Sequence, residues 1–164
     1  MRPPPTIREA GRADAAQIFG LIRALAAYEH LEHEVEATLE AIEAALFGPN
    51  PKVFCDIAFD REKAVGIAIW FYTFSTFRGR CGLWIEDLYV SPDYRGQGLG
   101  RTLIARLARR CLDENLGRLE WSVIDWNEPS IAFYKRLGAR LMDDWTICRM
   151  EGPALLEIAS PGLP

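Results

Sequence analysis

The chain has 164 residues, with 19 lysines and arginines against 23 acidic residues, a net charge of −4 at pH 7. This length suits one domain, and the charge balance argues against binding along a nucleic-acid backbone, which needs clustered positive charge. The hydrophobic fraction of 49% and the charged fraction of 26% are typical of globular proteins and exclude wholesale disorder.

The sequence carries no signal for export, membrane insertion or metal binding. Residues 1–5 (MRPPP) lack the apolar core of a signal peptide, and the longest apolar stretch, 64–74, is too short to cross a bilayer. The cysteines are scattered, without a Cys-x-x-Cys pair, so we expect reduced thiols rather than a zinc site or a disulfide framework. We therefore expect a cytoplasmic protein with no metal and no membrane or nucleic-acid partner.

The first predicted elements are a short strand and an amphipathic helix. Residues 6–10 favour a strand, and Asp14 then predicts a helix start, with Gln17 closing a capping box. Apolar residues follow at helical spacing: Ile18, Leu21, Ile22 and Leu25. This stripe indicates a helix with one buried face.

The remaining predicted elements alternate strands with helices. Strands are predicted over 53–59, 64–74, 83–90, 119–124 and 145–150. Helices are predicted over 37–47, 98–114 and 129–137. Hairpin-linked strands followed by a strand–helix–strand unit indicate an α+β fold with helices on both faces of a mixed sheet. We expect a single domain over 1–164, with loose ends at 1–5 and 160–164.

A glycine-rich segment follows the strand at 83–90 and leads into the helix that starts at Gly98. Its sequence is Arg95-Gly96-Gln97-Gly98-Leu99-Gly100. Glycines let the backbone approach a ligand, and a helix start offers unpaired N–H groups and a positive dipole end. Together they predict a pyrophosphate cradle, to which Arg95 and Arg101 would add charge. The dinucleotide fingerprint and the P-loop pattern both fail here, and a plain strand-to-helix turn is the structural alternative.

The spacing Arg95-x-x-Gly98-x-Gly100 resembles the acetyl-CoA pyrophosphate motif of the GNAT superfamily of N-acetyltransferases. Segments 84–90, 93–96 and 126–139, together with 25–29, resemble the diamine (spermidine/spermine) N-acetyltransferases within it. The resemblance implies a GNAT-like, mostly antiparallel central sheet with a splayed central strand pair. It also implies acetyl-CoA as cosubstrate, acetyl transfer to a primary amine, and a homodimer.

The chemistry calls for a proton acceptor near the amine. An alkylamine with a pKa of about 10.4 is neutral in only about one molecule in a few thousand at pH 7, so a nearby carboxylate is valuable. Glu86, just before the glycine loop, is the first candidate, acting directly or through water, and by resemblance it also contacts the amine. Strand alternation places Trp84 and Leu88 on its face and Asp87 on the opposite face, where Asp87 is expected to be structural.

The chemistry also calls for a proton donor, because the CoA thiolate leaves without a proton. Tyr134 lies where the family places this general acid, although its helical spacing with Ile131 and Leu137 also fits a packed core residue. By resemblance Asn127 contacts the cofactor, and it can at the same time cap the helix that Pro129 begins.

The resemblance also implies how the cofactor is held. The pantetheine arm is expected to add to the strand through backbone groups of Leu88 and Val90, and the N–H near Leu88 would steady the thioester oxygen. The expected cofactor-binding set is Leu88, Tyr89, Val90, Arg95, Gly96, Gln97, Gly98, Leu99, Gly100, Arg101 and Asn127.

Substrate contacts are the last group that the resemblance implies. They are placed at Tyr28, Glu29, Glu86, Asp144 and Trp145, and carboxylates and aromatic faces suit a cationic amine. Where the diamine enzymes carry Asp-Pro-Trp, this chain has Ser75-Thr76-Phe77. The loss of an acidic contact leaves thialysine, or another small amino-acid amine, open as the substrate.

Two further functions remain as alternatives. One is protein N-acetylation, which rapid acetylation of peptide amino termini, with none of free polyamines, would favour. The other is a non-catalytic acyl-CoA sensor that keeps the cradle without the chemistry. Retention of both Glu86 and Tyr134 speaks against the sensor.

Overall fold

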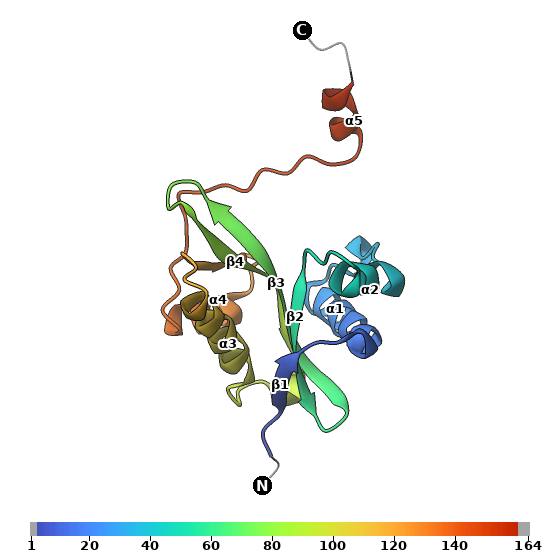
Figure 1. Ribbon diagram of the computed structural model, residues 1–164, viewed down its shortest axis with the longest axis vertical. Coiled ribbons are helices and arrows are strands. Elements are labelled where there is room, and N and C mark those ends of the chain that lie inside the picture. Colours follow the sequence, from blue (N-terminus) through green and yellow to red (C-terminus); the bar gives the residue numbers. More distant parts are fainter. Residues whose placement is uncertain (1–2, 161–164) are drawn as a thin grey trace. The chain divides into compact units, whose positions relative to one another are not determined.

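The computed structural model describes residues 3–160 (Figure 1). Of the ends expected to be loose, residues 1–2 and 161–164 lie outside the described residues. The chain divides into two compact units, Met1–Ile124 and Asp125–Pro164, and each is described by itself. The single domain expected from the sequence therefore stays a prediction.

The first unit contains a five-stranded sheet, as far as residues 3–160 show, in the order β1-β2-β3-β4-β5. Strands β1 to β4 are antiparallel neighbours, and β5 runs parallel to β4. The strands are β1 Thr6–Glu9, β2 Phe54–Asp60, β3 Lys63–Ser75, β4 Arg80–Val90 and β5 Leu119–Trp121. The predicted α+β fold with a mostly antiparallel sheet is confirmed.

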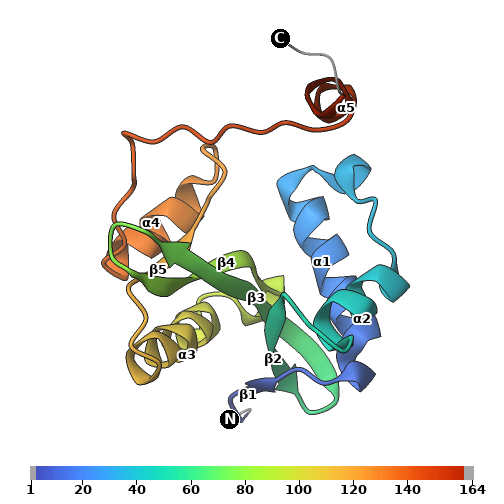
Figure 2. The ribbon, with the colours of Figure 1, turned by 45° about the horizontal axis from the view of Figure 1, so that its top comes forward.

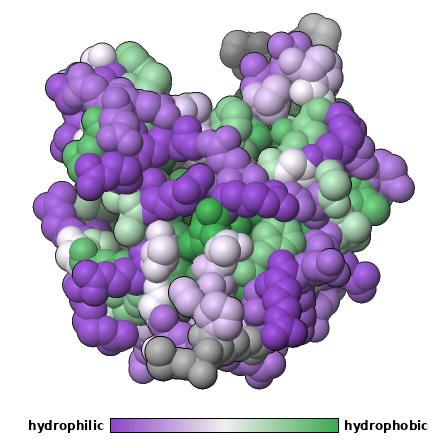
Figure 3. Space-filling model, turned by 60° about the horizontal axis from the view of Figure 1, so that its bottom comes forward, coloured by the Kyte–Doolittle hydropathy of each residue, from purple (hydrophilic) through white to green (hydrophobic). Residues whose placement is uncertain are grey.

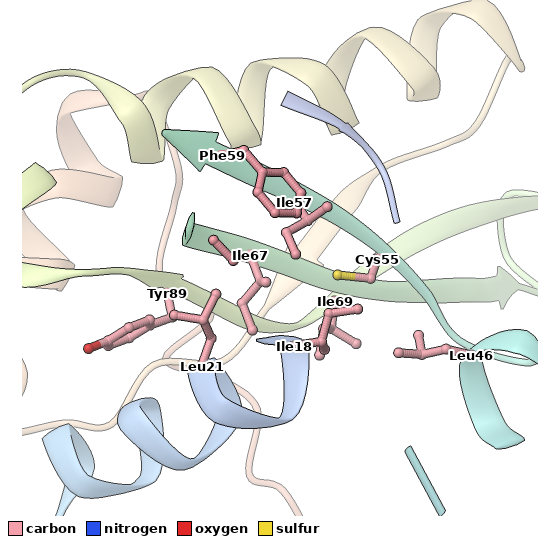
Figure 4. Close-up of a cluster of buried hydrophobic side chains, with 10 residues drawn as sticks. Ile18, Leu21, Leu46, Cys55, Ile57, Phe59, Ile67, Ile69 and Tyr89 are labelled. Carbon is pink, nitrogen blue, oxygen red and sulfur yellow. The ribbon is translucent and has the colours of Figure 1, made fainter. Parts of the chain in front are cut away.

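Helices α1 (Ala15–Glu29) and α2 (Leu39–Phe47) cover one face of this sheet (Figure 2). The apolar stripe predicted for α1 is confirmed, because Ile18 and Leu21 are buried in a core with inward side chains of β2 and β3. Figure 4 shows this core, in which Ile67 and Ile69 lie beside Leu21 and Ile18 of the helix. Burial of such side chains drives α1 onto the sheet.

Helix α3 (Leu99–Asp113) covers the opposite face (Figure 2). Because successive strand residues point to opposite faces, Asp56 and Ala58 face α3 while Cys55 and Ile57 face α1. Asp56 is fully buried, and its Oδ1 accepts a hydrogen bond from Arg106 Nε on α3 at 2.9 Å. This ion pair fastens the middle of α3 to the centre of the sheet.

The start of α1 differs from the prediction. Asp14 holds the N-cap position, but its side chain does not cap the helix. Its carboxylate instead accepts hydrogen bonds from the Gly11 N–H at 2.7 Å and from Arg8 of β1. Gln17 accepts the Ala64 N–H at 2.7 Å. The predicted capping box is therefore wrong, because both side chains find partners in the strands next to the helix.

Strand β5 is shorter than the predicted 119–124. It pairs only with Leu83–Ile85, in the first half of β4. Beyond Ile85, β4 carries a bulge at Glu86, which bends the strand and ends the pairing. The edge of β4 from residue 86 to 90 thus has no strand beside it within residues 3–160, as expected for a splayed strand pair.

The second unit contains α4 (Glu128–Arg136) and α5 (Pro153–Ala159). The predicted helix at 129–137 is confirmed, but the predicted strand at 145–150 is wrong. Trp145 and Ile147 in this segment are each 73% exposed, and no strand among the described residues pairs with it. Alternating apolar residues do not make a strand unless a neighbouring backbone takes up their N–H and C=O groups. Helix α5 was not predicted.

None of the helices within residues 3–160 is long and apolar enough to span a membrane. On the face shown in Figure 3, hydrophilic residues form most of the surface and hydrophobic residues appear in smaller areas between them. All four cysteines are free thiols: Cys55 and Cys111 are buried, whereas Cys81 and Cys148 are exposed.

Candidate active site

The glycine loop lies between β4 and α3, where Gly96 and Gly98 have φ angles of 73° and 85°. These are left-handed conformations that glycine adopts at little cost. A Cβ added at either position would meet no atom within 4 Å. Both glycines are therefore required by the backbone conformation, and the space in front of them is open to a ligand.

The start of α3 presents unpaired backbone donors. The first helical hydrogen bond runs from the Thr102 N–H to the Gly98 carbonyl at 3.0 Å. The N–H groups of Leu99, Gly100 and Arg101 precede it and have no carbonyl partner in the helix. Donors at the positive end of a helix suit a diphosphate. The loop thus fits the diphosphate of acetyl-CoA.

The loop is fixed to the sheet by its side chains. Leu99 and Tyr94 are buried against Ala58 and Val65, and the Tyr94 hydroxyl donates to Asp60 Oδ2 at 2.6 Å. The Gln97 side chain donates to the Asp93 carbonyl at 2.8 Å. Among the predicted cofactor residues, Gln97 and Leu99 therefore use their side chains to hold the loop, and the N–H of Leu99 is one of the unpaired donors.

The two predicted phosphate cations have different surroundings. Arg101 is exposed in the first turn of α3, beside the unpaired N–H groups. Arg95 donates from Nε to the Val90 carbonyl at 2.9 Å. Its guanidinium carbon lies 4.5 Å from the ring centroid of Tyr28 on α1. Arg95 thus joins the loop to both β4 and α1.

Polar backbone groups of Leu88 and Val90 point to the unpaired edge of β4. The Ser91 N–H donates to the Val65 carbonyl at 2.9 Å, which makes these two residues a hydrogen-bonded pair of the β3–β4 ladder. Such pairs alternate along antiparallel strands, so the intervening Val90 and then Leu88 direct their N–H and C=O away from β3. These are the groups that the resemblance assigns to the pantetheine arm.

The bulge in β4 corrects the prediction for Asp87. Ile85 and Asp87 pair with consecutive residues of β3, so Glu86 between them has no partner residue. Asp87 lies opposite Ile69 on the face that carries α1, and Leu88 falls on the α3 face. Glu86 Oε2 accepts the Trp84 indole N–H at 3.1 Å, also on the α1 side. Asp87 therefore shares a face with Glu86, whereas regular alternation predicted opposite faces.

Three carboxylates interact on this face. Burial raises the pKa of Asp87 from its ordinary value of 3.8 to about 6, and the charges of Glu86 and Glu29 add to the rise. Burial also raises the pKa of Glu29, on the last turn of α1. Both charges acting on Asp87 are negative. A cation bound at the cluster Glu29, Glu86 and Asp87 would therefore reduce the electrostatic repulsion among the three carboxylates. No group of three or more potential metal ligands is found in the described part of the chain.

Asp87 is the functional candidate that sequence reasoning missed. Two adjacent acids in an otherwise apolar central strand were the available signal, since a buried strand rarely carries charge. A bulge leaves no mark in the sequence that would reveal the change of face. The face of Asp87 became visible only from the pairing of β3 with β4.

Asn127 and Tyr134 belong to the second unit. Asn127 is buried, and its Oδ1 accepts the Ser130 N–H at 3.3 Å, which confirms the expected cap of α4. Tyr134 is 9% exposed, with its ring centroid 5.3 Å from that of Phe133. The cofactor contact of Asn127 and the acid role of Tyr134 stay predictions.

Asp144 and Trp145, the remaining predicted substrate contacts, also lie in the second unit. Both are exposed and lie in irregular chain, where the Trp145 N–H bonds to the Met142 carbonyl at 3.1 Å in a turn. The cluster formed in the first unit contains Glu29, Glu86 and Asp87. The roles of Asp144 and Trp145 stay predictions.

Comparison with known proteins bears on both fold and chemistry. The model of the acetyltransferase (GNAT) family, whose members use acetyl-CoA, matches residues 16–139. Thialysine N-epsilon-acetyltransferase from Sus scrofa is 37% identical, over 93% of this chain and 96% of the relative. Spermidine/spermine N(1)-acetyltransferase-like protein 1 from Homo sapiens is 31% identical, over 93% of this chain and 23% of the relative.

A solved structure gives the same answer for the fold. An integron cassette protein from V. cholerae aligns with a TM-score of 0.80 and 25% identity, over 96% of this chain and 98% of that one. Family match, relatives and fold agree with the glycine loop described above. The chain therefore belongs to the GNAT family of acetyltransferases and is an N-acetyltransferase, which transfers an acetyl group to an amine.

Proposed function

We propose that this chain transfers the acetyl group of acetyl-CoA to a primary amine of a small cationic substrate of polyamine or diamine type. The observation that carries the proposal is the carboxylate cluster Glu29, Glu86 and Asp87 beside the strand that leads to the glycine loop. An ammonium group relieves the repulsion within this cluster. The anionic cofactor has its own donors at the start of α3. The cationic amine and the anionic cofactor thus each have a binding region of opposite charge: the carboxylate cluster for the amine, and the N–H groups at the start of α3 for the cofactor.

The cluster also supplies the proton acceptor. The ammonium form of the amine cannot attack, and at pH 7 an alkylamine is almost wholly protonated. Glu86 accepts the proton, directly or through a water molecule. Asp87 keeps the site negative above its raised pKa of about 6. At neutral pH the Asp87 carboxylate is therefore available to the cation.

Acetyl-CoA brings an acetyl group already activated as a thioester. The N–H groups at the start of α3 bind its diphosphate, and backbone groups of Leu88 and Val90 bind the pantetheine arm in the manner of an added strand. The Leu88 N–H steadies the thioester oxygen. In this proposal the amine attacks the thioester directly, without an acetylated cysteine. The two buried thiols, Cys55 and Cys111, are poorly suited to carry an acetyl group, because burial raises their pKa values.

Two residues of the second unit complete the proposed chemistry. Tyr134 donates a proton to the departing CoA thiolate, because a phenol of pKa about 10 and a thiol of about 8.5 are close enough for transfer. Asn127 contacts the cofactor while it caps α4. Asp144 and Trp145 contact the amine.

Thialysine is the second candidate substrate. The 37% identity to thialysine N-epsilon-acetyltransferase supports it. The segment Ser75-Thr76-Phe77, which replaces the acidic Asp-Pro-Trp of the diamine enzymes, also supports it. These residues are at the tip of the β3–β4 hairpin, where Phe77 is 99% exposed. A missing carboxylate there removes a partner for the distant ammonium group of a long polyamine.

A homodimer is also proposed. Large apolar side chains are exposed along the chain from 142 to 158: Met142, Trp145, Ile147, Met150, Leu155, Leu156 and Ile158. Exposed apolar surface of this kind favours association. Sedimentation velocity should give twice the chain mass, and a monomer at micromolar concentration would contradict the proposal. The single domain and the cytoplasmic location stay predictions.

A competition assay tests the substrate. Acetyl-CoA is supplied with equal concentrations of spermidine, putrescine, lysine and thialysine, and the acetylated products are quantified by mass spectrometry. Preferred acetylation of spermidine or putrescine supports the proposal, and preferred acetylation of thialysine supports the second candidate. Acetylation of peptide amino termini with no turnover of these amines would overturn both. The same follows if acetyl-CoA binds and no amine is turned over.

A further inference from the structure

The Arg95 side chain makes three contacts in the first unit. Its Nε donates to the Val90 carbonyl at 2.9 Å. Its guanidinium carbon lies 4.5 Å from the ring centroid of Tyr28 and 5.6 Å from that of Tyr89. A guanidinium over an aromatic face within about 6 Å is attracted by the ring. Arg95 is therefore held between two tyrosines and a backbone carbonyl.

These contacts connect the segments that are proposed to bind the amine and the cofactor. Tyr28 is on the last turn of α1, directly before Glu29 of the carboxylate cluster. Val90 is the last residue of β4, and its carbonyl points to the unpaired edge expected to receive the pantetheine arm. Arg95 itself is the first residue of the glycine loop. One planar side chain thus links the amine side of the site to the cofactor side.

The Tyr28 ring already has a cationic partner in Arg95. The resemblance assigns Tyr28 to the amine, whose ammonium group would lie over its aromatic face. The guanidinium of Arg95 already lies over this ring at a distance typical of a cation–π contact. The contact with Arg95 gives Tyr28 a role that needs no contact with substrate, because it fixes the position of the neighbouring Glu29.

We propose that Arg95 is a positioning residue that couples the two substrates: through Tyr28 it sets the end of α1, and through Val90 it sets the cofactor strand and loop. The inference rests on the proposed function, since it takes Glu29 as part of the amine site. A ligand that orders the loop also orders the end of α1, so the second ligand has less disorder to remove. Each substrate therefore tightens the binding of the other, by the same factor.

Calorimetry with CoA, which carries no acetyl group and so cannot react, measures this factor. The Kd of CoA is determined alone and with saturating spermidine, or with thialysine if the competition assay favours it. We expect about a fivefold tighter Kd with the amine, at the lower end of known couplings. Arg95→Lys keeps the charge but loses the planar group, and Tyr28→Leu loses the ring. Each is expected to bring the factor close to one.

Matched variants separate coupling from simple loss of binding. Arg101→Lys changes an exposed arginine in the first turn of α3, and it should keep the wild-type factor even if CoA binds more weakly. Tyr28→Phe retains the ring and should keep the factor too. The double variant of Arg95→Lys and Tyr28→Leu should show no more loss than either change alone, as expected when two residues act as one contact.

The results that would overturn the inference are distinct from those that would overturn the proposed function. A wild-type factor of one would overturn it, as would an unchanged factor in folded Arg95→Lys or Tyr28→Leu protein. If Tyr28→Phe brought the coupling factor to one, the effect would depend on the hydroxyl rather than on the ring, and this result would overturn the inference as well. The proposed function fails separately, if wild-type protein turns over none of the four amines.

Discussion

Glu86 and Asp87, neighbours in β4, have their carboxylates on the same face of the sheet, because the strand bulges at Glu86. The same bulge ends the pairing of β4 with β5, which stops at Ile85. One local irregularity therefore produces two features of the site: a concentrated negative charge on the α1 side and an unpaired strand edge for the cofactor. Bulges often re-aim side chains next to active sites, and this one acts on both reactants.

Replacing Asp87 with asparagine should stabilise the protein at neutral pH. The pKa of Asp87 is raised from 3.8 to about 6, so between these values the folded chain binds more protons than the unfolded chain. Stability therefore falls as pH rises through this window. We expect Asp87→Asn to be about 2 kcal/mol more stable than wild type at pH 7.5, because the variant no longer has to ionise a largely buried carboxyl group.

Urea unfolding at two pH values checks this prediction. The advantage of Asp87→Asn should shrink at pH 4.5, where the wild-type group is largely protonated in the folded state. Asp93→Asn, a change at an exposed acid, serves as control and should change stability by less than about 0.5 kcal/mol. An Asp87→Asn protein no more stable than wild type at pH 7.5 would contradict the raised pKa. The same variant should have a higher KM for the amine, because the site loses a negative charge.

Glu86→Gln should lower kcat by about 100-fold at pH 7, since general-base catalysis contributes roughly this much. The amide oxygen can still accept the indole N–H of Trp84, so the local structure should be kept. Activity of the variant should recover as pH rises, because more of the amine is then neutral without help. Steady-state rates from pH 6 to 10 measure both effects. A variant with wild-type kcat at pH 7 would remove Glu86 from the mechanism.

The sequence predicts those parts of the fold and site that depend on local pattern. The stripe that includes Ile18 and Leu21 faces the core as helical spacing requires, and the spacing of Gly96 and Gly98 fits the loop conformation found. Features that depend on contacts between distant segments could not be predicted from the sequence. The face of Asp87 follows from a pairing shift opposite Ile69. The segment 145–150 has strand-like alternation, but a strand also needs a partner, which alternation does not supply.

Gly98→Ala should weaken CoA binding about tenfold, which is an expectation for one or two lost phosphate contacts. A Cβ at Gly98 meets no protein atom within 4 Å, so it projects into the open space in front of the unpaired N–H groups. The positive φ of 85° adds roughly 1 kcal/mol of backbone strain. Calorimetric titration with CoA measures the loss of affinity.

Gly79→Ala is the matched control for this change. Gly79 lies at the tip of the β3–β4 hairpin with a φ of 61°, and a Cβ there also meets no atom within 4 Å. Both variants should lose similar stability, but only Gly98→Ala should lose CoA affinity. Equal CoA affinities in the two folded variants would contradict the phosphate-loop assignment.

Asp56→Ala should destabilise the protein by about 3 kcal/mol, at the lower end of the cost of breaking a buried pair, because Arg106 is 41% exposed and regains some water. Asp56→Asn keeps an oxygen for the Arg106 Nε and should cost less. Urea unfolding of both variants gives the two values. Equal costs would show that the carboxylate charge, which both variants lose, determines stability at this position, rather than the acceptor oxygen that asparagine retains.

Tyr134→Phe should lower kcat by about 10- to 100-fold while leaving the Kd of CoA unchanged. The change removes only the hydroxyl, and the ring keeps its packing against Phe133 at 5.3 Å. Without the phenol the departing thiolate must take its proton from water, so the chemical step slows while binding is retained. Rapid-quench measurement of the first turnover isolates this step from product release. A single-turnover rate equal to that of wild type would leave Tyr134 as a packed residue of α4, and it would exclude it as the general acid.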